Sequence, residues 1–256
     1  MLRLAADLHI HTVLSPCASR AMTPAAIVRE AAARGVEVIA VCDHNTAGNV
    51  TAVAAAAARM DRGPFVIAGI EITTSEEVHV LGYFPSAESA VEAGRAVTER
   101  LPLWRPLTSR TASVSRGPRE PDQQIVDAEG NVTGIEERML AAASPYSLSE
   151  TVDLIHSCGG LAIAAHMDRR SFSVPGQLGF LPPDVPFDGL EISAAGVSRG
   201  CEREFACHGI TLISSSDSHF PTEIGTGITA LDVESMSFDE LALALRGSCG
   251  RGCAIA

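Results

Sequence analysis

Side chains of the types that bind metal ions follow five short apolar runs of this sequence. The runs cover residues 4–8, 36–42, 65–70, 161–165 and 210–216, and each has the length and composition of a buried strand. The polar side chains that follow them are His9, His11, Asp43, His44, Glu71, His166, Asp217 and His219. This set contains most of the eight histidines of the chain, so core packing alone does not explain the pattern.

The spacing of these residues favours a shared site. Side chains two residues apart on a strand point to the same face, so His9 and His11 converge, as do Asp217 and His219. Imidazole and carboxylate groups together suit divalent ions such as zinc, manganese or iron, and one carboxylate can bridge two ions. A single His-x-His pair would be weak evidence. His156 and His208 lie outside the pattern and are expected to be structural.

Alternating strand and helix patterns supply the scaffold for these residues. Helices are predicted over 24–34, after a Thr23 cap, over 50–62, 86–100 and 238–246, and after the capping box of Ser147 and Glu150. Such alternation favours an α/β layer or barrel with a buried, largely parallel sheet. In such folds, sites form where the strands end, because many loops meet at that edge.

Residues 101–139 interrupt this alternation and are predicted to form an insertion in a single domain that covers 1–256. Residues 101–119 are rich in arginine and contain no acid, and 124–136 has the pattern of a β-hairpin. The basic half either contacts an anionic substrate or forms a solvated loop, and the sequence leaves both alternatives open.

Composition excludes several classes of function. The 256 residues carry 31 acids and 19 bases, a net charge of −12, which argues against a broadly basic nucleic-acid surface. All the bases are arginines, which excludes lysine Schiff-base chemistry and a P-loop lysine. No secretory signal or bilayer-spanning run is found, and seven irregularly spaced cysteines indicate reduced thiols, so we expect a cytoplasmic protein without a membrane partner. The oligomeric state is not predicted.

The sequence resembles the PHP (polymerase and histidinol phosphatase) domain family. The resemblance extends over residues 7–219, in the order and spacing of the family's motifs. The matching segments are Asp7-Leu8-His9-Ile10-His11-Thr12, Cys42-Asp43-His44-Asn45, Gly69-Ile70-Glu71, His79-Val80-Leu81-Gly82, Ala164-Ala165-His166 and Ser216-Asp217-Ser218-His219. The resemblance implies a distorted (β/α)7 barrel with a metal cluster, often trinuclear, at the C-terminal ends of its strands.

Carried over to this sequence, the resemblance implies two to three divalent ions (Zn, Mn or Fe) at neighbouring sites. The implied ligand sets are His9, His11, Glu71 and Asp217 for one ion; Glu71, His79 and His166 for a second; and Cys17, His44 and His219 for a third. Cys17 stands where the family frequently has histidine or aspartate. A thiolate there would favour zinc or iron, whereas the alternative is a small buried thiol beside a weak or empty third site.

The function implied is a metal-dependent phosphoesterase of the 3′,5′-bisphosphate nucleotidase or 5′→3′ exonuclease type. Clustered cations lower the pKa of a bound water toward ~7 and neutralise the phosphate oxygens, so Glu71 and Asp217 would act through the ions they hold. Arg169 is the candidate for binding substrate phosphate. Asp43 either orients a ligand imidazole or caps a turn. The alternatives are an L-histidinol-phosphate phosphatase, with the same ligands, and a metal-binding regulatory module without catalysis.

Overall fold

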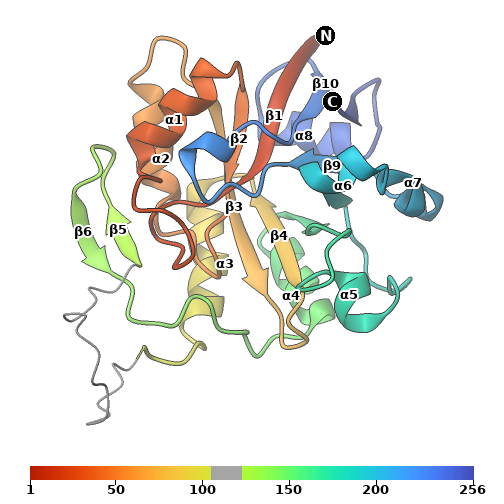
Figure 1. Ribbon diagram of the computed structural model, residues 1–256, viewed down its shortest axis with the longest axis horizontal. Coiled ribbons are helices and arrows are strands. Elements are labelled where there is room, and N and C mark those ends of the chain that lie inside the picture. Colours follow the sequence, from red (N-terminus) through yellow and green to blue (C-terminus); the bar gives the residue numbers. More distant parts are fainter. Residues whose placement is uncertain (105–122) are drawn as a thin grey trace.

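A nine-stranded sheet, curled into a nearly closed barrel, forms the centre of the molecule (Figure 1). The computed structural model describes residues 1–104 and 123–256. The strands of the sheet, in spatial order, are β11 (Gly252–Ile255), β10 (Thr229–Val233), β1 (Leu2–Ile10), β2 (Val38–Val41), β3 (Phe65–Thr73), β4 (His79–Phe84), β7 (Leu161–Ala164), β8 (Gly189–Ser193) and β9 (Leu212–Ser215). The α/β barrel expected from the sequence is therefore confirmed.

The directions of the strands bring the ends that carry the candidate metal ligands to one edge of the sheet. β1, β2 and β3 are parallel to one another, as are β7, β8 and β9, and β4 runs antiparallel between these two groups. The C-terminal ends of the six parallel strands and the N-terminal end of β4 therefore lie at the same edge of the sheet.

The sheet is mixed, whereas the sequence favoured a largely parallel one. A tight turn joins β3 to β4 without a crossover helix, and it is closed by the hydrogen bond from Thr74 N to Val78 O (2.8 Å). A direct connection of this length can only join antiparallel strands. At the other end of the sheet, β10 runs antiparallel to both β1 and β11.

The barrel closes at the functional edge, between β1 and the segment after β9. His11 N donates to Ser218 O (3.0 Å), and Ser218 N donates to His9 O (3.2 Å). Close to this junction, the pairing of β1 with β2 shifts register between Asp7 and Ile10. Leu8 belongs to the cluster inside the barrel, but Ile10 packs in the outer core. The irregularity thus changes which face each side chain takes, as bulges beside functional sites commonly do.

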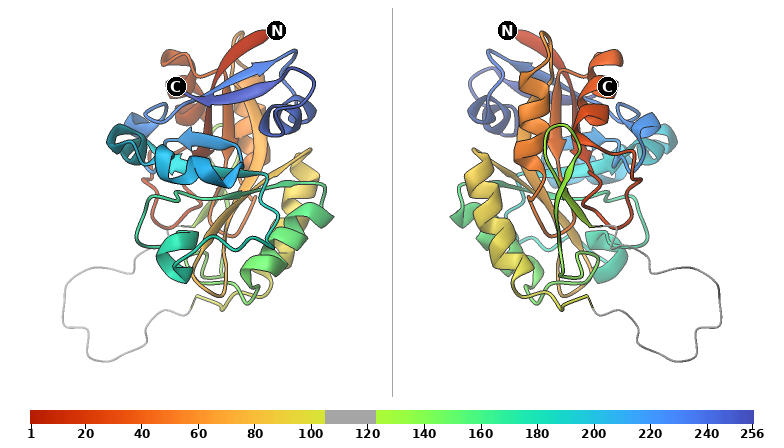
Figure 2. Two further views of the ribbon diagram at one scale, coloured as in Figure 1. Left: turned by 90° about the vertical axis from the view of Figure 1, so that its right-hand side faces the viewer. Right: turned by 90° about the vertical axis from the view of Figure 1, so that its left-hand side faces the viewer.

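Helices cover the outside of the barrel. They are α1 (Pro24–Ala33), α2 (Val50–Ala58), α3 (Ala87–Thr98), α4 (Leu148–Ser157), α5 (Val174–Leu178), α6 (Ala194–Arg199), α7 (Glu202–Phe205) and α8 (Phe238–Leu245), with short 3₁₀ turns at Ala206–His208 and Pro221–Glu223. The predicted Thr23 cap and the Ser147–Glu150 capping box are both present. α3 and α4 pack on β4 (Figure 2). Among the described residues, no helix combines the length and apolarity that a membrane span requires.

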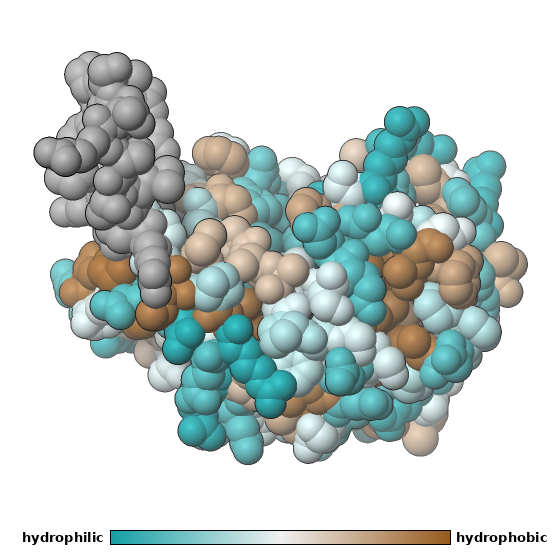
Figure 3. Space-filling view, turned by 90° about the horizontal axis from the view of Figure 1, so that it is seen from below, coloured by the Kyte–Doolittle hydropathy of each residue, from teal (hydrophilic) through white to brown (hydrophobic). Residues whose placement is uncertain are grey.

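Two hydrophobic cores hold these layers together. The larger core lies between the outer helices and the sheet and includes Ile27, Val53 and Ile70. The smaller core fills the barrel, where α8 contributes Leu241 and Leu245. On the molecular face seen from below, hydrophilic and hydrophobic residues are intermingled (Figure 3). Exposed apolar atoms are normal on protein surfaces, so this face does not by itself indicate a partner.

The predicted hairpin is present as β5 (Gln124–Val126) and β6 (Val132–Ile135), which form a separate two-stranded sheet. Asn49 anchors it, because its side chain donates to Gln124 O (3.0 Å) and accepts from Val126 N (3.0 Å). The arginine-rich part of the predicted insertion, at 105–122, lies outside the described residues.

Candidate metal centre

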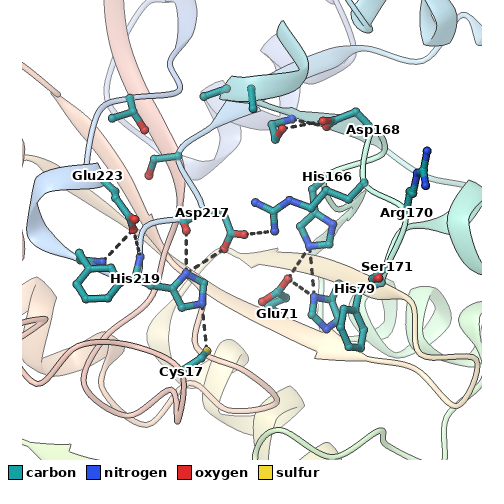
Figure 4. Close-up of a pocket in the computed structure, with 18 of the residues that line it drawn as sticks. Cys17, Glu71, His79, His166, Asp168, Arg170, Ser171, Asp217, His219 and Glu223 are labelled. Atoms are coloured by element: carbon teal, nitrogen blue, oxygen red, sulfur yellow. Dashed lines mark hydrogen bonds and ion pairs between the residues drawn. The ribbon is translucent and has the colours of Figure 1, made fainter. Parts of the chain in front are cut away.

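All nine side chains implied as metal ligands lie at one edge of the barrel. Figure 4 shows six of them: Cys17, Glu71, His79, His166, Asp217 and His219. β1 contributes His9 to this edge, and His11 follows it directly, while Glu71 lies in β3 and His79 begins β4. His44, His166, Asp217 and His219 stand in the segments that follow β2, β7 and β9, and Cys17 lies in the loop after β1.

Glu71 is at the centre of the group, because its two carboxylate oxygens contact five imidazoles. Oε1 lies 2.6 Å from His79 Nδ1 and 3.2 Å from His166 Nε2. Oε2 lies 3.0 Å from His44 Nδ1, 3.3 Å from His11 Nε2 and 3.5 Å from His9 Nε2. The side chain is buried. A carboxylate with separate histidines around each oxygen is arranged as a bridge between two cations.

Asp217 adds a second carboxylate beside the β1 histidines. Its Oδ1 lies 3.0 Å from His11 Nε2 and 3.3 Å from His9 Nε2. One ligand atom from each of His9, His11, Glu71 and Asp217 lies within 4.8 Å of all the others in this set. These four residues are the first ligand set implied by the family resemblance.

The geometry of the other two sets is partly different from the implied one. His79, His166 and Glu71 are in mutual contact, with His79 Nδ1 3.3 Å from His166 Nε2. His44, however, groups with Glu71 and His79 as well as with His11 and His219. Cys17 contacts both His44 and His219, with its Sγ 3.0 Å from His219 Nε2. His44 therefore lies between two candidate ion positions.

Several buried polar atoms of this centre have no hydrogen-bond partner among the described residues. They are His9 Nε2, His44 Nδ1, Glu71 Oε2 and His166 Nδ1. Burying such atoms without a partner is costly, and native proteins satisfy nearly all of them. His9 Nε2 and His44 Nδ1 both face Glu71 Oε2, at 3.5 and 3.0 Å. Imidazole nitrogens around a carboxylate oxygen are a donor set that suits divalent transition-metal ions, so the residues present fit the implied metal.

The electrostatics of the centre keep both carboxylates ionised. Burial raises the pKa of Glu71, but His79, His44 and His9 outweigh that effect and hold the pKa well below its usual range. Burial has the same effect on Asp217, whose pKa is nevertheless held well below normal, chiefly by His9. Both side chains are therefore negatively charged at neutral pH, as metal ligands must be.

Two of the candidate ligands have a strained backbone. His166 has φ of 30° and Asp217 has φ of 51°, which is the left-handed region that side chains other than glycine seldom adopt. Strain of this kind persists where the surrounding structure enforces it, and it is concentrated at functional sites. Both residues stand two positions after the last residue of a parallel strand, where this conformation turns the chain sharply.

Glu191 is a functional candidate that the sequence analysis missed. It lies in β8, is buried, and accepts from His9 Nδ1 at 3.1 Å and from His166 N at 2.8 Å. A carboxylate on the second nitrogen of a ligand imidazole fixes the orientation of the ring. The available signal was a glutamate in the middle of an apolar strand, because a buried carboxylate requires a partner.

Asp43 contacts the centre through a serine. Its Oδ1 accepts from Ser15 Oγ at 2.6 Å, and that oxygen lies 3.0 Å from His11 Nδ1. Asp43 also accepts from the backbone and hydroxyl of Thr12, both at 2.7 Å. Asp43 thus fixes the turn after β1 and contacts the partner of a candidate ligand, so the two alternatives left open by the sequence both apply.

A pocket of about 950 Å³ opens over the centre, and Arg169 lies in its wall. Nη1 of Arg169 is 2.5 Å from Asp217 Oδ2, and 43% of the side chain is exposed. Arg170 and Arg199 line the same pocket. The volume is at the upper end of the range of about 300–1,000 Å³ for small-molecule sites. The pocket therefore combines a buried anionic and imidazole-rich floor with cationic walls.

Known proteins resemble this chain over nearly its whole length. A 3′,5′-nucleoside bisphosphate phosphatase of Chromobacterium violaceum is 27% identical over 260 residues, which cover 87% of this chain and 90% of the relative. A 5′-3′ exoribonuclease of Haemophilus influenzae is 24% identical and covers 88% of this chain and 95% of the relative. Residues 203–249 match the family of PHP-associated sequences. This match supports the resemblance to the PHP family that the sequence motifs indicate.

A solved structure supports the fold of this protein. The lesion-specific endonuclease PfuEndoQ of Pyrococcus furiosus superimposes with a TM-score of 0.70 at 19% identity. The superposition covers 98% of this chain but only 58% of the endonuclease. The PHP-type barrel predicted from the sequence motifs is thereby confirmed.

Proposed function

We propose that this protein is a metal-dependent phosphoesterase that hydrolyses phosphate esters of nucleotides or of short oligonucleotide ends. The observation that carries the proposal is the buried cluster of histidines around Glu71 and Asp217, with unpartnered ligand atoms, at the floor of a pocket walled by arginines. The names of the two sequence relatives, a nucleoside bisphosphate phosphatase and an exoribonuclease, support this class of substrate.

Two to three divalent ions, of zinc, manganese or iron, are the proposed cofactors. His9, His11, Glu71 and Asp217 would hold one ion, and Glu71 would share a second with His79 and His166. Bound there, such ions lower the pKa of a bound water toward ~7 and neutralise charge on the phosphate. His44 and His219, with Cys17, would hold the third ion.

Each protein group then has a distinct task in the proposed reaction. Glu71 and Asp217 carry the negative charge that fixes the ions, while Glu191 orients the ring of His9 from behind. Arg169 is proposed to bind the substrate phosphate, since its guanidinium already contacts Asp217 and its side chain is partly exposed in the pocket. A guanidinium presents two parallel donors to a phosphate, which orients the ester as well as binding it.

Removing the Cys17 thiol is expected to lower the metal content of the protein by about one ion per chain. In Cys17→Ala, His219 loses the neighbour 3.0 Å from its Nε2, and the third candidate set keeps only imidazoles. Elemental analysis of protein purified without chelator measures the change. The matched control is Cys207→Ala, which removes an exposed thiol outside the pocket and should leave the metal content unchanged. Equal metal content in wild type and Cys17→Ala would exclude Cys17 as a ligand.

A substrate panel tests the proposed function. With manganese or zinc, we expect phosphate release from nucleoside 3′,5′-bisphosphates, or nucleotide release from short 5′-phosphorylated RNA, to exceed phosphate release from L-histidinol phosphate. The reason is the pocket, whose volume of about 950 Å³ accommodates a ligand with sugar and base. Selective hydrolysis of histidinol phosphate would favour that alternative. Failure to hydrolyse any of these esters, in protein shown to contain metal, would favour a regulatory module.

A further inference from the structure

The loop that follows β7 presents three different recognition groups to the pocket within seven residues. His166 places an imidazole in the candidate metal centre, Arg169 adds a guanidinium, and Phe172 adds a phenyl ring. Hydrogen bonds hold this loop in shape. Arg169 N donates to His166 O (3.0 Å), Ser173 Oγ donates to Arg169 O (2.5 Å), and His79 N donates to Phe172 O (2.8 Å). The three groups are therefore positioned before any ligand arrives.

Phe172 is held in an unusual position for an aromatic residue. Its φ is 61°, a conformation that is a genuine outlier for a bulky side chain. Its ring stacks on His79, with ring centroids 4.6 Å apart and an angle of 20° between the planes. The residue is nevertheless 42% exposed and lines the pocket. A strained backbone that holds an apolar ring at the wall of a polar pocket points to a ligand-binding role.

A second exposed phenylalanine lines the same pocket on another side of the centre. Phe220 directly follows His219, is 50% exposed, and has its backbone N–H fixed by the Glu223 carboxylate at 3.0 Å. His219 and His79 lie on different sides of the pair formed by Glu71 and Asp217 (Figure 4). Phe172, stacked on His79, and Phe220, the neighbour of His219 in the sequence, thus line the pocket next to histidines on opposite sides of this pair.

We propose that Phe172 and Phe220 are stacking platforms for nucleobases. The proposal rests on the proposed phosphoesterase function, and it specifies that the preferred esters carry a base close to the scissile phosphate. In this proposal the phosphate binds at the centre and Arg169, and the base lies against Phe172, which stacks on the candidate ligand His79 and lines the same pocket. A longer substrate places a second base toward Phe220. Stacking tolerates every base because each has a π-face, so the platforms select nucleotides without reading sequence.

Leucine substitutions test the platforms by their effect on base-bearing and base-free substrates. Leucine keeps an apolar cover over His79 but removes the aromatic face. In Phe172→Leu we expect kcat/KM for a nucleoside 3′,5′-bisphosphate to fall about fivefold to 150-fold, mainly through KM, which is the equivalent of 1–3 kcal/mol of base stacking. Ribose 5-phosphate, which has no base, should be hydrolysed at an unchanged kcat/KM. Phe220→Leu should lower kcat/KM for a 5′-phosphorylated dinucleotide.

Phe180→Leu is the matched control, because Phe180 is 60% exposed and lies outside the pocket. It should leave kcat/KM for all these substrates unchanged. Equal losses on nucleotide and ribose 5-phosphate in Phe172→Leu would show that the ring only supports His79, and would overturn the proposal. Unchanged kcat/KM for every substrate in both platform variants would overturn it as well.

A binding measurement separates this proposal from the proposed function. Wild-type protein should quench the fluorescence of 2-aminopurine riboside 5′-monophosphate through stacking. Phe172→Leu should quench it less, and Phe180→Leu should quench it to the same extent as wild type. Quenching that depends on Phe172 in a protein without hydrolytic activity would refute the phosphoesterase and keep the platform. If the protein hydrolyses nucleotides but Phe172→Leu changes neither the quenching nor the kinetics, the platform is refuted and the phosphoesterase is kept.

Discussion

Replacing Asp217 with asparagine is expected to abolish phosphoester hydrolysis while the protein remains folded. Asn removes the negative charge beside His9, His11 and Arg169. Because losing even an outer partner of a metal ligand costs about 10–100-fold in activity or metal affinity, loss of this ligand should cost more than about 100-fold in kcat/KM. Steady-state kinetics with a generic phosphoester and added manganese or zinc measures the loss.

The backbone at this position tolerates the substitution. Asp217 has φ of 51°, and asparagine adopts the left-handed region more readily than most residues, so circular dichroism and the melting transition should show a folded protein. Asp188→Asn is the matched control. Asp188 also accepts a hydrogen bond from a histidine, His156 Nε2 at 2.8 Å, but it lies outside the pocket. Full turnover by Asp217→Asn would remove Asp217 from the proposed site.

Removing the metal is expected to eliminate the activity of wild type reversibly, whereas added metal should not give activity to Glu71→Gln. Dialysis against a chelator should abolish turnover, and adding back manganese or zinc should restore it. Glu71→Gln removes the carboxylate that contacts the imidazoles of His79, His166 and His44, so metal should not restore the activity. Activity assays before and after metal addition, with metal content measured in parallel, check both parts.

Glu240→Gln controls for the loss of a buried glutamate. Glu240 is 8% exposed and pairs with Arg251 at 2.9 Å, away from the pocket. Its variant should lose activity on chelation and regain it with metal, like wild type. Wild-type activity that survives complete removal of divalent ions would contradict a metal-dependent reaction, and recovery of Glu71→Gln to the wild-type rate would contradict the bridging role of Glu71.

The sequence reveals most of this site because of how parallel strands end. His9, His11, Glu71 and Asp217 could be predicted to converge, since each stands at the C-terminal end of an apolar run and such ends share one edge. His79 could not be placed by that argument. It begins β4, the antiparallel strand, and reaches the same edge only because a tight turn replaces a crossover helix. Only the family resemblance indicated it.

Other features depend on contacts between segments that sequence spacing does not specify. His44 lies between two candidate ion positions because Glu71 approaches it from β3 and His219 from the segment after β9. Glu191 was hidden within a short apolar run, where its role follows from the burial of its side chain and its bond to His9. Phe172 is neither periodic nor part of a motif, and its importance emerges from its backbone angle and its stacking on His79.

Anomalous diffraction from crystals grown with manganese or zinc tests the central claim most directly. The account predicts two to three strong peaks within one cluster, with oxygens of Glu71 about 2.0–2.2 Å from two of them if the ion is zinc. An ordered structure without an anomalous peak at coordination distance from Glu71 and Asp217, in a protein that still hydrolyses phosphoesters, would contradict it.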